Sequence, residues 1–314
     1  MKPVALPPNQ PRQFYRGGQA IAAFRAGNAG ATGDFGPEDW VASATTLFGQ
    51  DAGLSTLPDG ATLRDAIAAD PVAYLGAAHA AVYGTSPALL VKLLDAGERL
   101  PVHVHPDRAF AQRHLNCRFG KTEAWLVIGA GDSAAVYVGF KADVDQRAVD
   151  AWVSSQRGEM LLETLNRIPV RRGDTVLIPA GTPHAIGEGV FVIELQEPTD
   201  FSVMLEWEGF GLADRAGEQL GLPAPLALSC LDRSGWSDDR LSTCVSRAVM
   251  SGARGVRSVL PQQAEPFFRA TQIVSDGDLA LEPQYGVLVV LDGAGQLVGD
   301  FGDPLEIHRG DTVL

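Results

Sequence analysis

The chain has 314 residues, of which 46% are hydrophobic, and its 38 acidic and 25 basic side chains give a formal net charge of −13 at pH 7. This composition indicates a globular protein with room for about two domains, and the negative charge argues against nucleic acids and anionic membranes as partners. Three cysteines without a CxxC pair argue against a disulfide framework and fit a reducing cytoplasm.

The first hundred residues are expected to mix short strands with helices. Prolines interrupt the first eight residues, and no apolar run approaches the ~18 residues of a membrane span, so neither a secretion signal nor a transmembrane helix is expected. Thr62, followed by an amphipathic stretch, predicts a capped helix that extends to Ala69. The apolar run Leu89–Leu94 predicts a strand or another buried segment.

A strand is then expected around the sequence Pro101-Val-His-Val-His-Pro106. Its histidines, His103 and His105, are two residues apart, and residues i and i+2 of a strand face the same side. Both imidazoles can therefore point into one interior. Glu123 opens another apolar run, Ala124–Ile128, and so begins a further strand.

Another strand, within Val170–Ile178, leads to His184 through a turn with two glycines and a proline. Such a turn swings the histidine inward, and chance rarely supplies it after an HxH pair. Three imidazoles and one carboxylate suit Zn, Fe, Mn or Ni and leave room for water or substrate. The alternative is that these are ordinary strand and turn residues. The pattern favours one metal ion in a β-barrel of cupin type, and the predicted ligands are His103, His105, Glu123 and His184.

Residues 108–121 form a cationic stretch without any acidic side chain. The stretch joins the HxH strand to the Glu123 strand, so we expect a loop at the mouth of the metal site that could attract an anionic group such as phosphate. The alternative is a solvated loop that only happens to hold arginines. Lys121 is the best candidate, because it lies two residues before Glu123 and faces the same side. The four cations are Arg108, Arg113, Arg118 and Lys121.

Between Val149 and Leu165 the spacing of apolar residues becomes helical, which predicts one or two helices inserted between strands. A strand is expected again at Val190–Leu195. Residues 209–254 are expected to form a connection, with a helical stretch near Leu241–Val249.

The hexapeptide Arg172–Leu177 recurs as Arg309–Leu314. Six identical residues in the same strand context predict two related barrels, a mainly β bicupin with helices inserted in the first barrel. A chance match of a common turn and strand is the alternative. The second copy lacks an HxH pair and is expected to hold no metal. We expect a metal-binding catalytic domain over 1–210, then a connection and a partial second barrel over 211–314, which stops before its last strands and leaves an unpaired edge.

Several phrases of the chain resemble type I mannose-6-phosphate isomerases (phosphomannose isomerases) of the cupin superfamily. The resemblance has specific motifs from about residue 35 to 205 and continues more weakly through the repeat. In that family zinc is held by a Gln-x-His pair, the glutamate of a Lys-Thr-Glu phrase and a distal histidine. By motif, these positions are His103, in place of the glutamine, and His105, Glu123 and His184, and the family's motif lysine matches Lys121. The phrases are Glu38–Ser43, Pro101–Pro106, Gly120–Trp125 and Gly173–Gly189.

Two positions depart from the family's pattern. The family follows its distal histidine with a Ser-Asp-Thr-Thr-Tyr-Arg phrase whose arginine serves the active site, and this chain has Met204 at that place. A serine expected before the metal pair is Pro101. Both changes point toward an altered choice or pose of the substrate.

The resemblance implies a metal-dependent aldose–ketose isomerase that acts on mannose 6-phosphate, fructose 6-phosphate or a related sugar. Such chemistry moves a proton between C1 and C2 through an enediol, so it needs a Lewis acid near the oxygens and a base over the carbons. A metal-dependent cupin dioxygenase and a non-catalytic sugar-binding cupin are the alternatives. Candidates for the base or its partner are Lys121, Glu188, Asp200 and Glu206. Candidates for substrate binding are Arg108, Arg113, Arg118 and Lys121.

Overall fold

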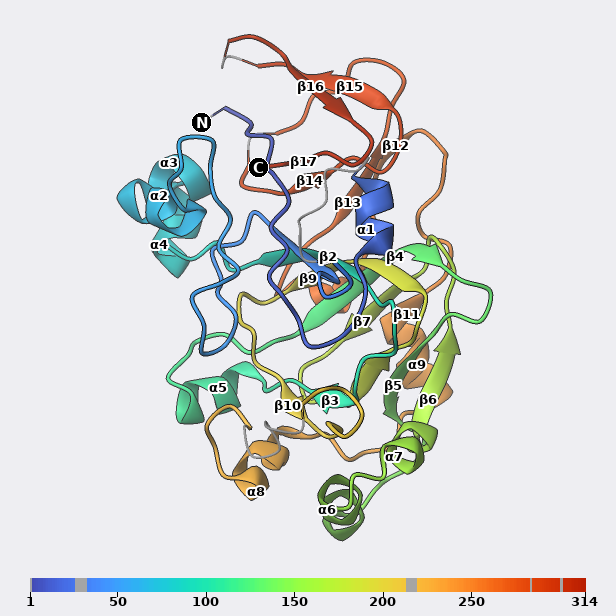
Figure 1. Cartoon of the computed structure of the whole chain (residues 1–314). Helices are drawn as coiled ribbons and strands as arrows, with labels where there is room; N and C mark the ends of the chain where they lie inside the picture. Colours follow the sequence, from blue (N-terminus) through green and yellow to red (C-terminus); the bar gives the residue numbers. More distant parts are fainter. Residues whose placement is uncertain (1, 26–32, 213–218, 283, 300–301) are drawn as a thin grey trace.

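A computed structural model describes residues 2–25, 33–212, 219–282, 284–299 and 302–314. This part of the chain is mainly β, as predicted, and its body consists of two antiparallel sheets (Figure 1). The larger sheet has six strands in the order β1-β2-β9-β4-β7-β11, and the smaller sheet has five in the order β10-β3-β8-β5-β6. Residues 213–218, inside the predicted connection, lie outside the described residues.

Both sheets draw their strands from the first 246 residues, and the chain passes between the sheets several times. The larger sheet is made of β1 (Glu38–Val41), β2 (Leu90–Asp95), β4 (Glu123–Ala130), β7 (Thr175–Ile178), β9 (Val190–Gln196) and β11 (Val245–Ser246). The smaller sheet is made of β3 (His103–Val104), β5 (Ala135–Phe140), β6 (Leu165–Pro169), β8 (His184–Ile186) and β10 (Val203–Met204).

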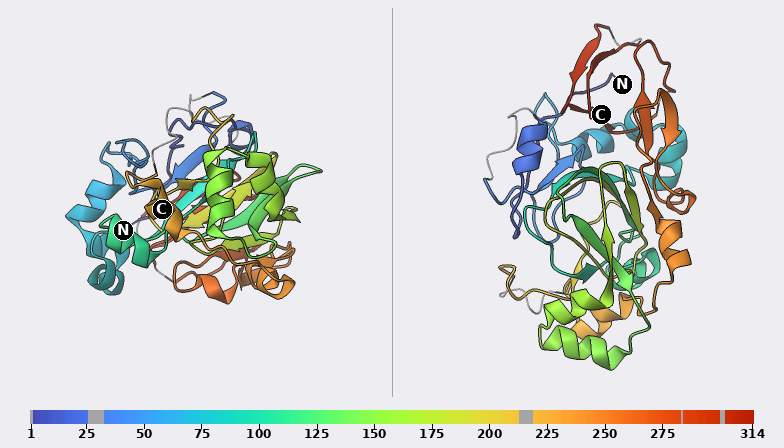
Figure 2. Two further views of the ribbon diagram at one scale, coloured as in Figure 1. Left: turned by 90° about the horizontal axis from the view of Figure 1, so that it is seen from below. Right: turned by 90° about the vertical axis from the view of Figure 1, so that its right-hand side faces the viewer.

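The helices are short and lie around the sheets, with α2 to α4 gathered on one side and α6 and α7 at the end opposite the two termini (Figures 1 and 2). Their bounds are α1 (Gln19–Phe24), α2 (Leu63–Ala69), α3 (Pro71–Leu75), α4 (Ala77–Tyr83), α5 (Arg108–His114), α6 (Gln146–Ser154), α7 (Gly158–Thr164), α8 (Ala224–Ala227) and α9 (Asp238–Cys244). The described residues also include the 3-10 turns η2 (Leu228–Cys230) and η3 (Gln262–Ala264). None of the described helices is long and apolar enough to cross a bilayer.

Strand alternation decides which face of the smaller sheet carries histidines. Val102 and Val104 pack in an apolar cluster with Val149 of α6 and Leu161 of α7, so this face of the sheet is covered by the two inserted helices. Because neighbouring residues of a strand point to opposite faces, His103 points to the other face, toward the larger sheet. The helices predicted between Val149 and Leu165 are thus present and seal the outer side.

Side-chain caps set where several helices begin. Thr62 Oγ1 accepts a hydrogen bond from Asp65 N at 3.1 Å, which confirms the capped helix predicted before Ala69. Asp107 Oδ1 likewise accepts from Phe110 N at 2.7 Å and starts α5. Residues 108–114 are therefore helical, which corrects the prediction of a loop over the whole cationic stretch.

The helical stretch predicted near Leu241–Val249 is also shorter than expected. Helix α9 ends at Cys244, and the next two residues pair with β7 as strand β11, with Val245 opposite Val176. A β-branched residue at this place suits a strand edge better than a helix interior.

The described remainder of the chain forms three two-stranded pairs. Strand β12 (Gly255–Ser258) pairs with β13 (Thr271–Val274), β14 (Leu288–Val289) with β17 (Thr312–Val313), and β15 (Ala294–Leu297) with β16 (Leu305–His308). The last four strands repeat an arrangement of the first body, in which β4 pairs with β7 and β5 with β6. The predicted repeat therefore has the same strand pairing, without the helices that separate β5 from β6.

The first copy of the repeated hexapeptide makes a tight turn. Gly173 N donates to Val127 O and Val127 N donates to Asp174 O, both at 2.9 Å. Asp174 Oδ2 accepts from Arg171 N, three residues earlier, at 3.1 Å. Gly173 has a φ of 98°, which explains the glycine.

The second copy makes the same turn with the same bonds. Gly310 N donates to Val290 O at 2.9 Å, and Val290 N donates to Asp311 O at 3.0 Å. Asp311 Oδ2 accepts from His308 N at 2.8 Å, and Gly310 has a φ of 94°. Identical residues thus direct identical local structure in both places.

An N-terminal segment covers the edge of β17. Val4 N donates to Leu314 O, Leu314 N donates to Val4 O, and Leu6 N donates to Thr312 O, each at 2.9 Å. The edge that was expected to stay unpaired is therefore paired by residues 4–6, far away in sequence, and the two termini lie together in Figure 1.

Replacing Asp174 with alanine should lower the free energy of unfolding by about 2 kcal/mol or more, because Asp174 is buried and accepts from Arg171 N, Ala248 N and the Arg247 guanidinium. The matched change at Asp311 removes one backbone bond at a partly exposed side chain and should cost below about 1 kcal/mol. Urea unfolding of both variants measures the difference, and equal losses would contradict the assignment.

The effect of Asp174 should depend on pH. Burial would raise the pKa of Asp174, but the N–H of Ala248 and the Arg247 side chain lower it below the usual range. Because its pKa is lower in the folded state, ionised Asp174 stabilises the folded protein above about pH 4. This stabilisation is lost as the pH falls through the folded-state pKa. The stability gap between wild type and Asp174→Asn should therefore narrow in acid, and a gap that widens would refute this account.

Candidate metal centre and adjoining cavity

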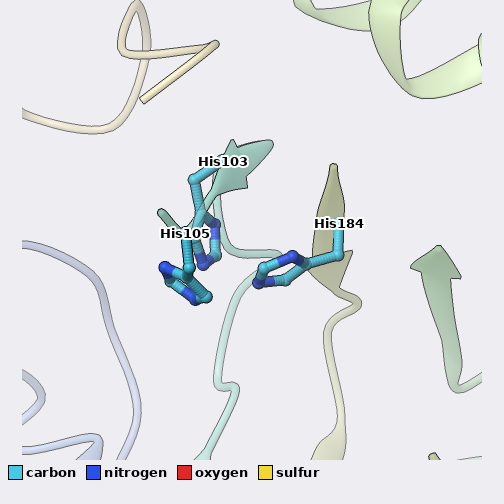
Figure 3. Close-up of side chains that lie close together, drawn as sticks. All are labelled: His103, His105 and His184. Atoms are coloured by element: carbon cyan, nitrogen blue, oxygen red, sulfur yellow. The ribbon is translucent and has the colours of Figure 1, made fainter. Parts of the chain in front are cut away.

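Three histidines from the smaller sheet meet in the interior. His103 on β3 is paired directly with His184 on β8, and His105 follows one residue after β3. The ring centroids are 4.2 to 4.9 Å apart, and one ring nitrogen of each histidine lies within 4.8 Å of those of the other two. Figure 3 shows the three rings turned toward a common point.

Hydrogen bonds to the backbone fix how each ring is turned. The Nδ1 atoms of His103, His105 and His184 lie 2.7 to 2.8 Å from carbonyl oxygens. A carbonyl can only accept, so each Nδ1 carries the proton and each Nε2 keeps a free lone pair. This tautomer is the one that metal-ligating histidines adopt. The carbonyls belong to Pro101, Phe201 and Thr182.

Glu123, the first residue of β4, brings a carboxylate to the same place. Its Oε2 lies 3.0 Å from His105 Nε2 and its Oε1 lies 3.3 Å from His184 Nε2, while Trp125 Nε1 donates to Oε1 at 3.1 Å. The Nε2 atoms of His105 and His184 thus face the carboxylate oxygens of Glu123, and neither the nitrogens nor the oxygens carry a proton that could form a hydrogen bond. Acceptors packed against acceptors need a cation, so the donor set fits a metal ion.

Lys121 supplies a positive charge at the edge of this set. Its Nζ, which is buried, lies 2.9 Å from His105 Nε2 and 3.1 Å from Glu123 Oε2. Burial lowers the pKa of His105 to about 3, with Lys121 adding to the effect. Burial would raise the pKa of Glu123, but Lys121 and His105 lower it well below its usual range. Near neutral pH the imidazole of His105 is therefore neutral and Glu123 is ionised, the forms that bind metals.

A buried polar wall continues from Glu123 across the larger sheet. Lys92 Nζ lies 3.2 Å from Glu38 Oε2 and 3.4 Å from Glu194 Oε1. Lys92 is paired with Glu194, and Glu194 with Trp125, so all three face the same side of the sheet as Glu123. Burial would lower the pKa of Lys92, but the surrounding carboxylates raise it, so the ammonium stays charged.

The buried polar wall was not predicted from the metal-ligand motifs, but the sequence contains a signal for it, a lysine within an apolar run. Lys92 is the one charged residue in the apolar run Leu89–Leu94, which we predicted as buried. A lysine in a strand buried on both faces needs carboxylate partners, and Glu194 lies at the matching place in the apolar strand β9.

Two of the four candidates for the base have no contact with the three histidines among the described residues. Glu188 is exposed on the turn between β8 and β9, and the pairing of Val190 with Ala130 puts that turn at the far end of β4 from Glu123, roughly 20 Å away. Glu206 is engaged by Arg99, whose two terminal nitrogens lie 2.7 and 2.8 Å from its oxygens. These predictions are corrected, because neighbourhood in sequence did not imply neighbourhood in space.

Asp200 does lie beside the site. Its Oδ2 accepts from Phe48 N at 3.0 Å. Burial raises the pKa of this carboxyl, and Lys92 and Lys121 only partly oppose the rise. Together with Lys121, it is one of two predicted catalytic side chains that the structure brings to the interior.

The predicted arginines are directed elsewhere. Arg108 Nε lies 2.5 Å from Glu197 Oε1, and its guanidinium covers the Phe267 ring. Arg118 donates to the carbonyl of Val82 at 3.0 Å and stacks on an aromatic ring, and Arg113 is exposed in the last turn of α5. Of the cationic stretch, only Lys121 contacts the four predicted ligands among the described residues.

A cavity of about 300 Å³ lies next to Phe201, and none of the four predicted metal ligands is among the residues that line it. It lies between residues 44–49 and 198–201, and Arg64, Ser86 and Cys117 also line it. Phe201, whose carbonyl holds His105 Nδ1, belongs to its wall. The cavity is therefore separated from the predicted metal centre by a single residue at this point.

Met204 stands at the position of the family's arginine and faces the site. It is paired directly with His103, so the two side chains share one face of the sheet. A thioether carries no charge and no N–H donor, so it cannot take over the role of a guanidinium.

Comparisons with known proteins confirm the resemblance to mannose-6-phosphate isomerases. No family model matches the chain. The sequence is 37% identical to the mannose-6-phosphate isomerase of Streptococcus mutans over 134 residues, 41% of either chain. It is 38% identical to the mannose-6-phosphate isomerase ManA of Bacillus subtilis over 117 residues, 37% of this chain and 36% of that protein. The matched region thus spans about two fifths of the length of these relatives.

The fold is shared over a larger extent than the sequence. The crystal structure of the Bacillus subtilis mannose 6-phosphate isomerase has a TM-score of 0.66 and 20% identity and covers 100% of this chain and 93% of its own. The crystal structure of a point mutant of phosphomannose isomerase from Salmonella typhimurium has a TM-score of 0.69 and 16% identity. The match covers 100% of this chain and 94% of that one.

Replacing His184 with alanine should weaken metal binding by more than about 100-fold, because loss of a ligand exceeds the effect of losing one of its hydrogen-bond partners. Titration with a chelating competitor and elemental analysis of the purified protein measure this. Met204→Leu, which removes no nitrogen or oxygen donor, is the control and should keep the wild-type metal content. A His184→Ala protein with unchanged affinity would remove this residue from the ligand set.

Proposed function

We propose that the chain is a metal-dependent aldose–ketose isomerase that interconverts mannose 6-phosphate and fructose 6-phosphate. The observation that carries the proposal is the meeting of three Nε2 atoms, the Glu123 carboxylate and the Lys121 ammonium in one interior beside a cavity of sugar size. The similarity to mannose-6-phosphate isomerases supports the choice of reaction and substrate.

We further propose zinc as the metal, one ion per chain, held by His103, His105, Glu123 and His184. Three nitrogen donors and one oxygen donor suit tetrahedral zinc, although Fe, Mn and Ni accept the same donors. A metal bound here would supply a Lewis acid to the carbonyl and hydroxyl oxygens of the sugar.

The protein's own groups offer a base for the proton transfer between the two carbons. Isomerisation takes a proton from C2 of the aldose and returns it to C1, so one base must reach both carbons. Asp200 fits this part, because its raised pKa makes it a stronger base than an exposed carboxylate and it lines the cavity. Lys121 Nζ would donate hydrogen bonds to the sugar oxygens, and the surrounding buried wall would exclude water.

At the level of architecture, we propose a bicupin with a metal-binding catalytic domain over residues 1–210 and a connection plus partial, metal-free second cupin over 211–314. The matching turns at Gly173 and Gly310 and the matching strand pairs support this division. A cytoplasmic location stays a prediction from sequence.

Replacing Lys121 with alanine should lower kcat by about 100-fold or more while the metal stays bound, because Lys121 donates to the substrate and is not a ligand. The control is Lys141→Ala, which removes an exposed lysine bonded to the carbonyl of Glu163 and should leave kcat unchanged. Coupled-enzyme assays of fructose 6-phosphate formation and elemental analysis give the two readouts. Full activity of Lys121→Ala would exclude this residue from the mechanism.

The same assays separate the alternatives. Met204 opposite His103 favours the non-catalytic alternative, and metal and sugar binding without turnover of any aldose or aldose phosphate would establish it. Oxygen consumption with an organic substrate would instead establish a dioxygenase.

A further inference from the structure

The cavity beside the histidines has two chemically different parts. In one part lie Asp200, whose carboxyl is influenced electrostatically by Lys92 and Lys121, and Phe201, whose carbonyl lies 2.7 Å from His105 Nδ1. The other part holds Arg64, in the first turn of α2, the only cationic side chain among the residues that line the cavity. An occupant with one neutral, oxygen-rich end and one anionic end would match these two parts.

The guanidinium of Arg64 is uncommitted. It has no hydrogen bond or ion pair with any other residue that the structure describes, whereas Arg108 is paired with Glu197 and Arg118 is bound to Val82 O. Arginine offers a fork of N–H donors that fits a phosphate in a bidentate manner. An arginine kept free at a cavity wall can give all of these donors to a ligand.

Arg64 matters because Met204 stands where an arginine was expected. Met204 faces His103 at the place where the resembling family has an arginine, so no guanidinium approaches the histidines from β10. The segments 44–49 and 198–201 enclose the cavity from two sides, and Phe48 and Phe201 meet edge to face with centroids 5.8 Å apart. Arg64 lines the same space from helix α2, so it is the cation available to an anionic occupant.

We infer that Arg64 binds the phosphate of the sugar phosphate and thereby orients the sugar with its carbonyl end toward Asp200 and the histidines. This inference rests on the proposed function for the reaction at the end near the histidines. The recognition of a phosphate monoester by Arg64 can be tested without turnover. Arg64 is then the residue that decides between phosphorylated and free sugars.

The kinetic test compares Arg64→Gln with wild type. Loss of a charge-assisted, bidentate contact should raise KM for mannose 6-phosphate roughly 10- to 100-fold with kcat nearly unchanged. Arg64→Lys should recover part of the affinity. Arg147→Gln, on the exposed face of α6, is the matched control and should behave as wild type. A KM for Arg64→Gln equal to that of wild type would overturn the inference.

A binding test uses Cys117, which lines the same cavity, and needs no catalysis. Cys244 is buried, and burial raises the pKa of Cys230 to about 12, so iodoacetamide should modify Cys117 first. Peptide mass spectrometry then reports how well a ligand protects Cys117. Mannose 6-phosphate should protect it in wild type at a concentration at least about 10-fold lower than in Arg64→Gln.

The probes distinguish the possible results. Free mannose should protect wild type and Arg64→Gln equally, and inorganic phosphate should protect only wild type. Protection by mannose 6-phosphate that does not depend on Arg64, or that is no better than protection by mannose, would overturn the inference. Protection that depends on Arg64 in a protein that isomerises no sugar would support the phosphate site and reject the proposed function.

Discussion

Three hydrogen bonds from imidazole Nδ1 atoms to backbone carbonyls govern the chemistry of the interior. They hold the lone pairs of three Nε2 atoms in one small space, next to a carboxylate. Among the residues that the structure describes, four carboxyl groups and two lysines interact electrostatically here, so the formal balance of these six groups is negative by two charges. A divalent cation would cancel that excess, which explains how so many acceptors can be buried together. The carboxyl groups belong to Glu38, Glu123, Glu194 and Asp200, and the lysines are Lys92 and Lys121.

Local periodicity was sufficient to predict the convergence of the histidines. The two-residue period of a strand put His103 and His105 on one face, and the turn before His184 brought the third ring across from them. The same period placed Lys121 with Glu123. These predictions depended on backbone geometry within a few residues, which short stretches of sequence determine strongly.

Predictions that needed long-range pairing were less successful. The positions of Glu188 and Asp200 relative to the histidines follow from which strand lies beside which, and the pairing of β4 with β9 over their whole length separates Glu188 from the site. The arginines of residues 108–118 were assigned by their position between two strands, but the Asp107 cap folds the first seven residues into a helix, and Glu197 engages Arg108. The role of Lys92 was not predicted, because residues 89–94 were interpreted from their apolar side chains. The carboxylate partners of Lys92 come from strands that are distant in sequence.

The pairing of residues 4–6 with β17 has a consequence for how the chain folds. The hydroxyl of Thr312 and the carbonyl of Leu6 are 306 positions apart, so the contact joins segments that are very distant in sequence. During synthesis residues 4–6 cannot form this pairing until residues 312–314 have been made. Contacts of this kind slow folding and leave strand edges exposed in the meantime. The pairing of residues 4–6 with β17 should therefore form late, and the metal centre, whose predicted ligands all precede β17 in the chain, can form before it.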